Sequence, residues 1–309
     1  MNVRIGTRGS QLALWQANHV KQRLEQEHPD ETFELVIIKT SGDQDQQTPL
    51  SQMGGVGLFT KQLEQALDDN TIDLAVHSCK DLPSEVDDRF QLPAFLEREK
   101  PMDVLISSTI RLSDLSEKSV VGTGSLRRVS QLKNRFPGIE TRDLRGNVDT
   151  RLAKLERGDY DAIILAYAGV HRLGLDDVIA DIIPVDLLVP AAAQGAVAIE
   201  CRADDGDTAT LAAVLNHQET HLAIREERNF LRAVEGGCKV PVGCHAWLDK
   251  NGFHISGFIG SLDGKNVVRH RMDLPENSAV DAGAILGKAM LADGGEEILN
   301  EIRMSGGIR

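Results

Sequence analysis

The chain has 309 residues, of which 34 are Lys or Arg and 47 are Asp or Glu, and its formal net charge is −13. Apolar residues make up 41% of the chain and aromatic residues only 4%, so there is material for large cores but few rings on which bases could stack. An acidic chain with few aromatic residues does not suit a nucleic-acid binder, and its net charge at first also argues against an anionic ligand. The length predicts two or three domains.

Neither a secretory signal nor a membrane span is visible in the sequence. The first residues lack the apolar core of a signal, and no apolar run approaches the ~20 residues of a membrane helix. The four cysteines (Cys79, Cys201, Cys238 and Cys244) include no C-x-x-C pair, so reduced thiols are expected. The sequence therefore predicts a cytoplasmic protein with no membrane association.

The first 100 residues alternate short β-rich runs with helical patterns, which is typical of βαβ units in a mostly parallel sheet with helices on both faces. Ser10 is expected to be the N-cap of a helix from Gln11 to about Glu27. The other expected elements are strands at 3–7, 33–39 and 72–77 and a helix at 60–67. Residues 41–57 have no usable period, and a loop of that length predicts a lid.

A second cycle begins near Asp103. Its expected elements are strands at 104–106, 120–121, 141–144 and 162–165 and helices at 126–136, with Ser125 as cap, and 148–157. It resembles the first cycle locally, because Gly6-Thr7 and Gly122-Thr123 both end a strand before a Ser and an Arg. This is a hint of two similar domains.

From about Asn216 the pattern changes. A helix at 220–234 precedes three strand-like runs near Ala246, Phe253 and Val267, and a further helix follows Ser278. Strands in series followed by a helix predict a small α+β domain with an antiparallel sheet.

Standard cofactor motifs are missing from the sequence. There is no phosphate-binding P-loop, no complete dinucleotide fingerprint, no nucleophile elbow and no H-E-x-x-H helix. Cys238, Cys244 and His245 match no familiar zinc spacing. We therefore expect no metal.

The charges are distributed unevenly. Between Gly122 and Arg157 there are nine basic residues and four acidic ones, a local net charge of +5, so the rest of the chain carries −18. The basic residues that fall near predicted helix starts are Arg8, Arg127, Arg128 and Arg145. Free N–H groups at helix starts favour anions, and guanidinium groups match carboxylates or phosphates. These arginines are candidates for anion binding, whereas Lys133, Arg135, Lys154 and Arg157 are read as solvated helix-face charges.

Two further residues could carry chemistry. Asp81 follows a buried strand in His77-Ser-Cys-Lys-Asp81; beside Lys80 it could be a surface ion pair or a carboxylate that moves protons and stabilises a cation. Cys238 lies in a Gly-Gly-Cys turn before Lys239, and it could be an exposed nucleophile or an inert small hydrophobe, the role assigned to the other three cysteines.

Together these segments resemble the porphobilinogen deaminase (hydroxymethylbilane synthase) family over nearly the whole chain. The matching segments are Gly6-Thr-Arg-Gly-Ser-Gln-Leu-Ala-Leu14, Gly57-Leu-Phe-Thr-Lys61, Asp73-Leu-Ala-Val-His-Ser-Cys-Lys-Asp81, Gly122-Thr-Gly-Ser-Leu-Arg-Arg128, Leu144-Arg-Gly-Asn147, Thr150-Arg-Leu152, Gln194-Gly-Ala196, Glu200-Cys-Arg202 and Glu235-Gly-Gly-Cys-Lys-Val-Pro-Val-Gly243. The combination of the two motifs His-Ser-x-Lys-Asp and Glu-Gly-Gly-Cys is highly specific for this family.

The resemblance implies a transferase of tetrapyrrole (porphyrin, heme) biosynthesis. Such an enzyme joins four porphobilinogen molecules head to tail, releases ammonia at each step and yields hydroxymethylbilane. It implies a covalent dipyrromethane cofactor held as a thioether on Cys238, which also carries the growing oligopyrrole chain. Asp81 would be the catalytic carboxylate, assisting loss of ammonia and stabilising the methylene-azafulvenium cation.

The resemblance also implies which residues bind the cofactor and the substrate. Cofactor binding would fall to Cys238, Lys80, Asp81, Thr123, Ser125, Arg127, Arg128 and Arg145. Substrate binding would fall to Arg8, Ser10, Phe59, Arg151, Arg172 and Gln194. No nucleic acid and no obligatory protein partner are implied, and a monomer is expected.

The implied fold is α/β, with two doubly wound periplasmic-binding-protein-like domains of mixed sheets and a small α+β C-terminal domain with a three-stranded antiparallel sheet. The expected domains are 1–98 with 194–215, containing lid loop 41–57 and Asp81; 99–193, rich in arginine; and 216–309, containing Cys238. The chain departs from the family pattern at Gln52, Val56, Gly124 and Ala193, so the lid is expected to act mainly as a gate.

Two other classes remain possible from the residues alone. A non-enzymatic binding module would explain the arginines but gives Cys238 no role. A transferase for a phosphorylated substrate would lack a phosphate loop or metal site.

Overall fold

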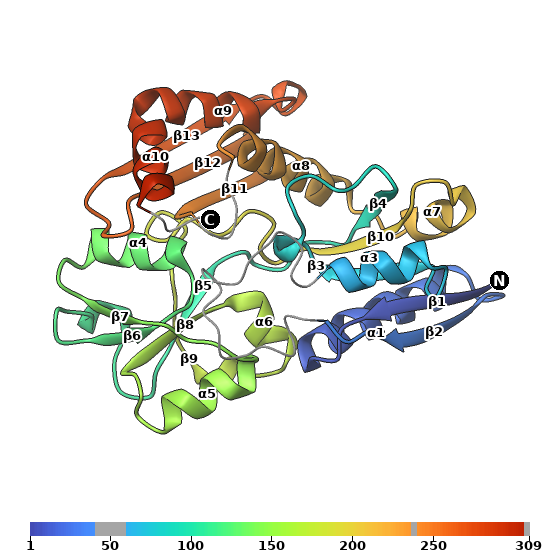
Figure 1. Cartoon of the computed structure of the whole chain (residues 1–309), viewed down its shortest axis with the longest axis horizontal. Helices are drawn as coiled ribbons and strands as arrows, with labels where there is room; N and C mark the ends of the chain where they lie inside the picture. Colours follow the sequence, from blue (N-terminus) through green and yellow to red (C-terminus); the bar gives the residue numbers. More distant parts are fainter. Residues whose placement is uncertain (41–59, 236–239, 306–309) are drawn as a thin grey trace. The chain divides into compact units, whose positions relative to one another are not determined.

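The computed structural model describes residues 1–40, 60–235 and 240–305. By their contacts, these residues form two compact units: 1–40, 60–99 and 195–221 in one, and 100–194 with 222–235 and 240–305 in the other. Three sheets are present in the described part of the chain, one in the first unit and two in the second (Figure 1). The three domains predicted from the sequence stay a prediction, and the proposed lid at 41–57 lies outside the described residues.

The first unit is built on a mixed five-stranded sheet in the order β2-β1-β3-β10-β4. Its elements are β1 (Asn2–Thr7), α1 (Gln11–Glu27), β2 (Thr32–Ile37), α3 (Lys61–Asp68), β3 (Leu74–Ser78), β4 (Phe90–Phe95), β10 (Val197–Arg202) and α7 (Gly206–Ala213). Strands β1, β2 and β3 are parallel, and β10 runs against both of its neighbours. The alternation along β3 sends Leu74 and Val76 into the core that holds α1, and Ala75 into the core that holds α3.

The second unit repeats this arrangement in the order β7-β6-β8-β5-β9. Its elements are β5 (Asp103–Ile106), β6 (Val120–Gly122), α4 (Leu126–Arg135), β7 (Glu140–Arg142), α5 (Val148–Glu156), β8 (Ala162–Ala166), α6 (Tyr167–Arg172) and β9 (Ile179–Ile182). Again three neighbouring strands are parallel and the fourth, β5, is reversed. The local sequence likeness between the two cycles therefore reflects a shared sheet topology.

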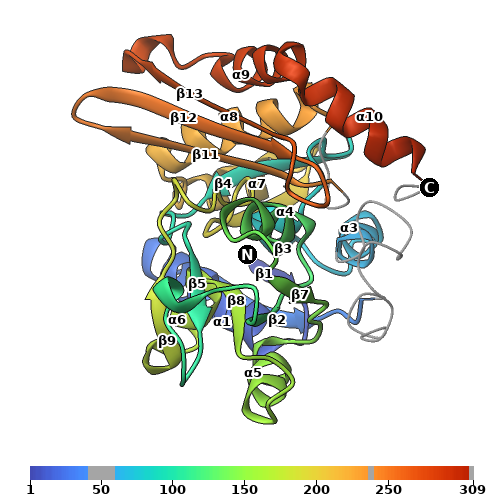
Figure 2. The ribbon, with the colours of Figure 1, turned by 90° about the vertical axis from the view of Figure 1, so that its left-hand side faces the viewer.

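A three-stranded antiparallel sheet, β11-β12-β13, completes the second unit (Figure 2). Its elements are α8 (Gln218–Ala233), β11 (Val242–Asp249), β12 (Gly252–Gly260), β13 (Val267–Leu274), α9 (Ala282–Met290) and α10 (Glu296–Met304). Side chains from β11 and β12, including Phe253 and Ile255, form one core with Phe230 of α8, Leu286 of α9 and Leu299 of α10. The predicted fold class, α/β with mixed sheets and a small antiparallel α+β part, is confirmed.

Two other findings concern what the described residues lack. No helix among them combines the length and the apolar character needed to cross a bilayer. Within the same ranges, no group of three or more His, Cys, Asp and Glu side chains is arranged to hold a metal ion.

Candidate functional site

Asp81 lies just beyond the carboxyl end of β3, in a short 3-10 turn formed by Cys79–Asp81. The backbone N–H of Cys79 donates to the carbonyl of Ala196 at 3.0 Å, and this bond ties the turn to the segment before β10. Ser78 exchanges hydrogen bonds of 3.0 and 3.1 Å with the side-chain amide of Gln16 on α1. The turn is thus fixed to elements on both sides of β3, and it presents half-buried Lys80 and Asp81 at the sheet edge.

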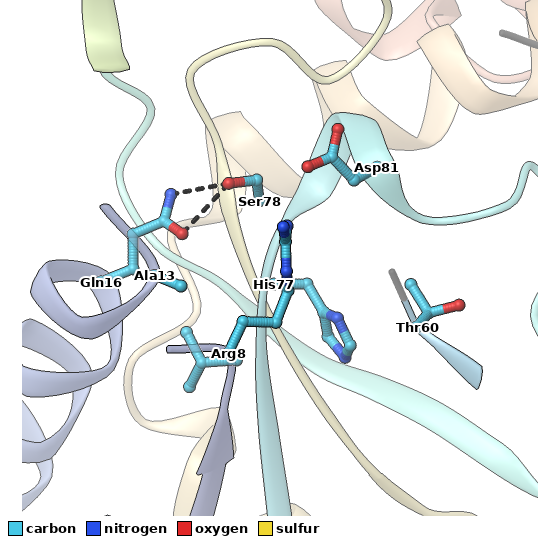
Figure 3. Close-up of a pocket in the computed structure, with 8 residues that line it drawn as sticks. Arg8, Ala13, Gln16, Thr60, His77, Ser78 and Asp81 are labelled. Atoms are coloured by element: carbon cyan, nitrogen blue, oxygen red, sulfur yellow. Dashed lines mark hydrogen bonds between the residues drawn. The ribbon is translucent and has the colours of Figure 1, made fainter. Parts of the chain in front are cut away.

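A small pocket collects residues from several elements around Asp81. Its lining residues are Arg8, Ala13, Gln16, Thr60, Val76, His77, Ser78 and Asp81, and Figure 3 shows the side chains of Arg8 and Asp81 extending into it. Of the predicted site residues, Arg8 and Asp81 are therefore brought together. They follow β1 and β3, which are neighbouring parallel strands. Residues at the carboxyl ends of such strands are expected to lie close together.

Ser10 has a structural task beside this pocket. It is the N-cap of α1, and its hydroxyl accepts a hydrogen bond from the backbone N–H of Ala13 at 3.3 Å. The predicted cap and helix bounds are confirmed. Ser10 and Arg8 are half-buried, so both retain an exposed part.

The arginines of the second unit form a separate, buried cluster around Asp103. Arg127 donates to one carboxylate oxygen of Asp103 at 2.8 Å, and Arg128 donates to the other at 2.7 and 3.1 Å. Both arginines also donate to backbone carbonyls, Arg127 to Val189 and Arg128 to Ile164. The two guanidinium groups are thus held in fixed positions by one carboxylate and the backbone.

The electrostatics of this cluster leave a surplus of positive charge. Burial alone would raise the pKa of Asp103, but the charges and hydrogen bonds of Arg127 and Arg128 outweigh burial and hold the pKa well below its usual range. One carboxylate therefore faces two guanidinium groups. In addition, Nε of Arg127 is buried and has no hydrogen-bond partner among the described residues, which fits a site that receives a carboxylate.

Gln194 belongs to the same cluster. Its amide donates to Asp103 at 2.9 Å and to the carbonyl of Pro101 at 2.7 Å. Ala193, just before it, has φ of 62°, the left-handed region in which glycine is favoured. Ala193, one of the positions at which the chain departs from the family pattern, therefore lies where glycine would be least strained.

The other predicted residues of the second unit lie nearby in sequence and fold. Thr123 is buried and its hydroxyl accepts from the backbone N–H of Ser125, which precedes α4 without a side-chain cap. Arg145 is buried, and Arg151 of α5 donates to the carbonyl of Gly146. Arg172 is half-buried and ends α6. Phe59 and Cys238 lie outside the described residues.

The four charges read as solvated differ from one another. Arg135 and Arg157 are exposed, as predicted. Lys133 and Lys154 are half-buried, and Lys154 donates to the carbonyl of Arg145 at 3.1 Å. Lys154 therefore supports the loop that carries Arg145, a role that a solvated charge would not have.

The three described cysteines, Cys79, Cys201 and Cys244, are buried. Burial is the main cause that raises the pKa of Cys201 to about 12, so this thiol stays protonated at neutral pH. These properties agree with the inert role predicted for them.

Sequence reasoning missed three buried partners of the site, His77, Asp103 and Glu200, as functional residues. Glu200 lies in β10 with no exposed surface, and Asp103 begins β5 equally buried. An acidic residue inside or beside an apolar run, as in Ala-Ile-Glu-Cys and Met-Asp-Val-Leu, is the signal that could have found Asp103 and Glu200, because buried charges need partners.

Comparison with known proteins adds to this geometry. The family model described as "Porphobilinogen deaminase, dipyromethane cofactor binding domain" matches residues 3–210, and "Porphobilinogen deaminase, C-terminal domain" matches residues 221–292. The chain belongs to the porphobilinogen deaminase family. Among similar curated proteins, porphobilinogen deaminase from Syntrophomonas wolfei is 48% identical over 98% of this chain and 99% of its own length. That from Geobacter sulfurreducens is 45% identical over 97% and 94%.

Solved structures with some likeness to this member of the porphobilinogen deaminase family are more distant. The periplasmic aliphatic sulphonate binding protein SsuA from Escherichia coli has a TM-score of 0.41 and 17% identity, over 75% of this chain and 70% of that one. The BenM effector binding domain has a TM-score of 0.43 and 17% identity, over 69% and 88%. Neither bears on the function at this level of similarity.

Proposed function

We propose that this chain condenses four porphobilinogen molecules head to tail, with release of ammonia at each step, to give hydroxymethylbilane. Membership of the porphobilinogen deaminase family supports an enzyme of tetrapyrrole biosynthesis. The observation that carries the chemistry is the pocket in which Asp81 and Arg8 meet at the carboxyl edge of the first sheet.

Asp81 is proposed as the catalytic carboxylate. Loss of ammonia from the aminomethyl group leaves positive charge on the substrate, and a fixed carboxylate stabilises that charge better than mobile water does. The same carboxylate then accepts the proton that the attacking pyrrole carbon loses. Arg8, in the same pocket, offers a donor for a substrate carboxylate.

Cys238 is proposed to hold the dipyrromethane cofactor as a thioether. When bound, this group supplies the pyrrole end to which the first substrate is joined. Its acidic side chains need cationic partners, and the Asp103 cluster offers Arg127 and Arg128 with surplus positive charge and a buried N–H of Arg127. Gly243 of β11, which follows Cys238 in the sequence, lies beside this cluster, because a Cβ built on it would be 3.2 Å from Cδ of Arg127. This proximity supports the proposed role of Cys238.

The remaining residues are proposed to hold the carboxylates of cofactor and substrate. Lys80, Thr123, Ser125 and Arg145 are assigned to the cofactor, and Arg8, Ser10, Phe59, Arg151, Arg172 and Gln194 to the substrate. A hydrogen bond to a charged group contributes ~1.5–3 kcal/mol, so several such bonds would order a polyanionic chain. The protein is further proposed to be a cytoplasmic monomer. Sedimentation of the purified chain tests the oligomeric state.

Intact mass tests the covalent attachment. The purified protein should carry an adduct equal to two linked pyrroles, and Cys238→Ser should lack it, while Cys244→Ser, at the buried cysteine nearest to it in the sequence, should keep it. An active protein of unmodified mass would refute the attachment.

Turnover tests Asp81. With a normal adduct in place, Asp81→Asn should lose at least about 100-fold in porphobilinogen consumption, whereas Asp87→Asn, at an exposed carboxylate paired with Arg89, should not. Near wild-type turnover of Asp81→Asn would remove Asp81 from catalysis.

A further inference from the structure

A buried histidine and a buried glutamate lie beside the Asp81 pocket and have no part in the function proposed above. His77 is on β3 and Glu200 on the antiparallel neighbour β10, where the register pairs His77 with Ala198. Nε2 of His77 lies 2.9 Å from Oε2 of Glu200, and the two side chains are 3% and 0% exposed. Both therefore lie inside the first unit, and His77 is one residue before the end of β3, the strand that leads to Asp81.

The contact between these two groups requires one shared proton. Either the imidazole N–H donates to a carboxylate, or a carboxylic acid donates to the imidazole nitrogen. A buried carboxylate is costly unless it is paired, and Oε1 of Glu200 has no hydrogen-bond partner among the residues that the structure describes. The pair thus holds one proton between two buried groups and leaves one carboxylate oxygen without a partner among the described residues.

The neighbouring charges act on this pair in opposite directions. From α3, Glu64 faces it, and the pKa of Glu64 is raised first by burial and then by the negative charge of Glu200. The acidic groups near His77 are therefore Glu64, Glu200 and, in the turn after β3, Asp81. Arg8, which follows β1, lines the same pocket and is a basic group beside them. The pair thus lies among charges of both signs.

The pocket joins this pair to Asp81. His77 and Asp81 both line it, together with the hydroxyl-bearing residues Ser78 and Thr60 (Figure 3). Its cavity volume is about 20 Å³, which is room for about one water molecule, and the polar lining supplies the partners that such a water needs. His77 and Asp81 thus line one polar pocket that has room for a water molecule.

We propose that His77 and Glu200 act through Asp81 as a proton relay, which returns Asp81 to its carboxylate form between successive condensations. This inference rests on the proposed role of Asp81. In each condensation one C–N and one C–H bond break and one C–C bond forms. The proton from carbon goes to Asp81 and passes through a bridging water to the His77–Glu200 pair, which returns it by the same route to the ammonia lost from the next substrate, and that ammonia departs as ammonium. No net proton stays on the protein, so the cycle can repeat.

The test uses the protein carrying its cofactor adduct, with His77→Gln and Glu200→Gln. Glutamine at either position keeps hydrogen-bonding groups but cannot pass a proton. We expect kcat for porphobilinogen to fall about tenfold with KM little changed, and the solvent deuterium isotope effect on kcat to rise. In His77→Ala, added imidazole should restore part of kcat, because it replaces the missing base.

The matched control is Asp73→Asn. Asp73 precedes the opposite end of β3 and accepts hydrogen bonds from Arg4 and Arg202, so its loss weakens the same sheet without touching the relay. It should lower the melting temperature and leave the isotope effect unchanged. If the relay variants lose kcat only in proportion to stability, as Asp73→Asn does, and imidazole gives no rescue, the relay is refuted.

Two further results separate this inference from the proposed function. Wild-type turnover and isotope effect in both glutamine variants, with Asp81→Asn inactive, would overturn the relay and leave the role of Asp81 standing. Turnover by Asp81→Asn would instead overturn that role. If the variants do not fold, ¹⁵N NMR of the imidazole of wild-type His77 decides: a proton shared between Nε2 and Glu200 supports the relay, and an unprotonated Nε2 without such a bond refutes it.

Discussion

Arg128 donates two hydrogen bonds to a single carboxylate oxygen of Asp103, from Nε at 3.1 Å and from Nη2 at 2.7 Å. The other oxygen accepts from Arg127. Replacement of Asp103 by Asn would leave two buried guanidinium groups without a counter-charge, and such a loss costs about 3–5 kcal/mol. Urea unfolding of Asp103→Asn at neutral pH should show a decrease of this size, whereas Asp263→Asn, in an exposed turn, should change stability by less than about 0.5 kcal/mol.

The same pair predicts a pH dependence. Because the pKa of Asp103 is lowered in the folded state by its arginine partners, its contribution is fully present above the unfolded pKa of about 3.9. It is lost as the pH falls through the lower folded value. The stability difference between wild type and Asp103→Asn should therefore be constant near neutrality and shrink only in acid. A difference that shrinks above pH ~5 would contradict this assignment.

Ala193 predicts a stabilising substitution. Its φ of 62° is strained for any residue with a Cβ, at about 1–2 kcal/mol. Glycine relieves that strain but loses more entropy on folding, so Ala193→Gly should raise the free energy of unfolding by about 0.5–1 kcal/mol. Ala192→Gly, at a buried neighbour with ordinary φ, should lower it. Equal effects of the two substitutions would show that the strain is absent.

At Gly243, by contrast, we predict that a substitution destabilises the protein. A Cβ there would lie 2.8 Å from the carbonyl oxygen of Val189 and 2.9 Å from that of Pro190, so the backbone would have to shift beside Arg127. We expect Gly243→Ala to cost about 1–3 kcal/mol and to impair formation of the adduct on Cys238, measured by intact mass. Gly206→Ala, where a Cβ meets nothing within 4 Å, should be neutral or slightly stabilising. A stable Gly243→Ala protein with a full adduct would contradict the close packing.

Ser10 and Ser125, which precede α1 and α4, should respond differently to loss of the hydroxyl. Ser10 accepts a hydrogen bond from Ala13, whereas Ser125 makes no side-chain cap bond. Thermal or urea unfolding should show a loss of about 1 kcal/mol for Ser10→Ala and a smaller loss for Ser125→Ala. The reverse order would mean that the cap of α4 forms in solution.

His254 on the outer face of the antiparallel sheet predicts a second pH dependence. Its hydrogen bonds to Asp273 and then to Asp249 raise its pKa. The stabilisation is fully present below the unfolded pKa of about 6.5 and is lost as the pH rises through the raised folded value. The difference in unfolding free energy between wild type and His254→Gln should decrease as the pH rises, and less so in an Asp273→Asn background. A difference that grows with pH would contradict the sign.

Much of the fold could be predicted from local sequence. Helix α1 has the bounds expected from its apolar spacing and its Ser10 cap, and the strands rich in Val and Ile were placed within a few residues. Three strands were not predicted. Strand β4 contains Pro93, which argues against a strand even though β4 is at the edge of the sheet. Strand β9 is short. Strand β10 carries Glu200 inside its buried run, so a charge interrupts its apolar pattern.

The candidate site divides in the same way. Arg8 and Asp81 each follow a strand, and adjacent parallel strands bring their ends together, so their meeting follows from topology. The pairing of Arg127 and Arg128 with Asp103 depends on residues 24 and 25 positions apart, and that of His77 with Glu200 spans 123 positions. No local pattern encodes such pairs, so the arginines could be read as ligand donors but not as members of an internal ion cluster.

The position of β10 has a consequence for the newly made chain. This strand lies between β3 and β4 but follows them by about 100 residues, so during synthesis both edges stay unpaired until Arg202 has left the ribosome. The second sheet, by contrast, is made from one continuous stretch, Asp103–Ile182. Of the two five-stranded sheets, the one that is encoded first is therefore completed second, and in the interval its exposed strand edges are the place where a nascent chain would need protection from aggregation.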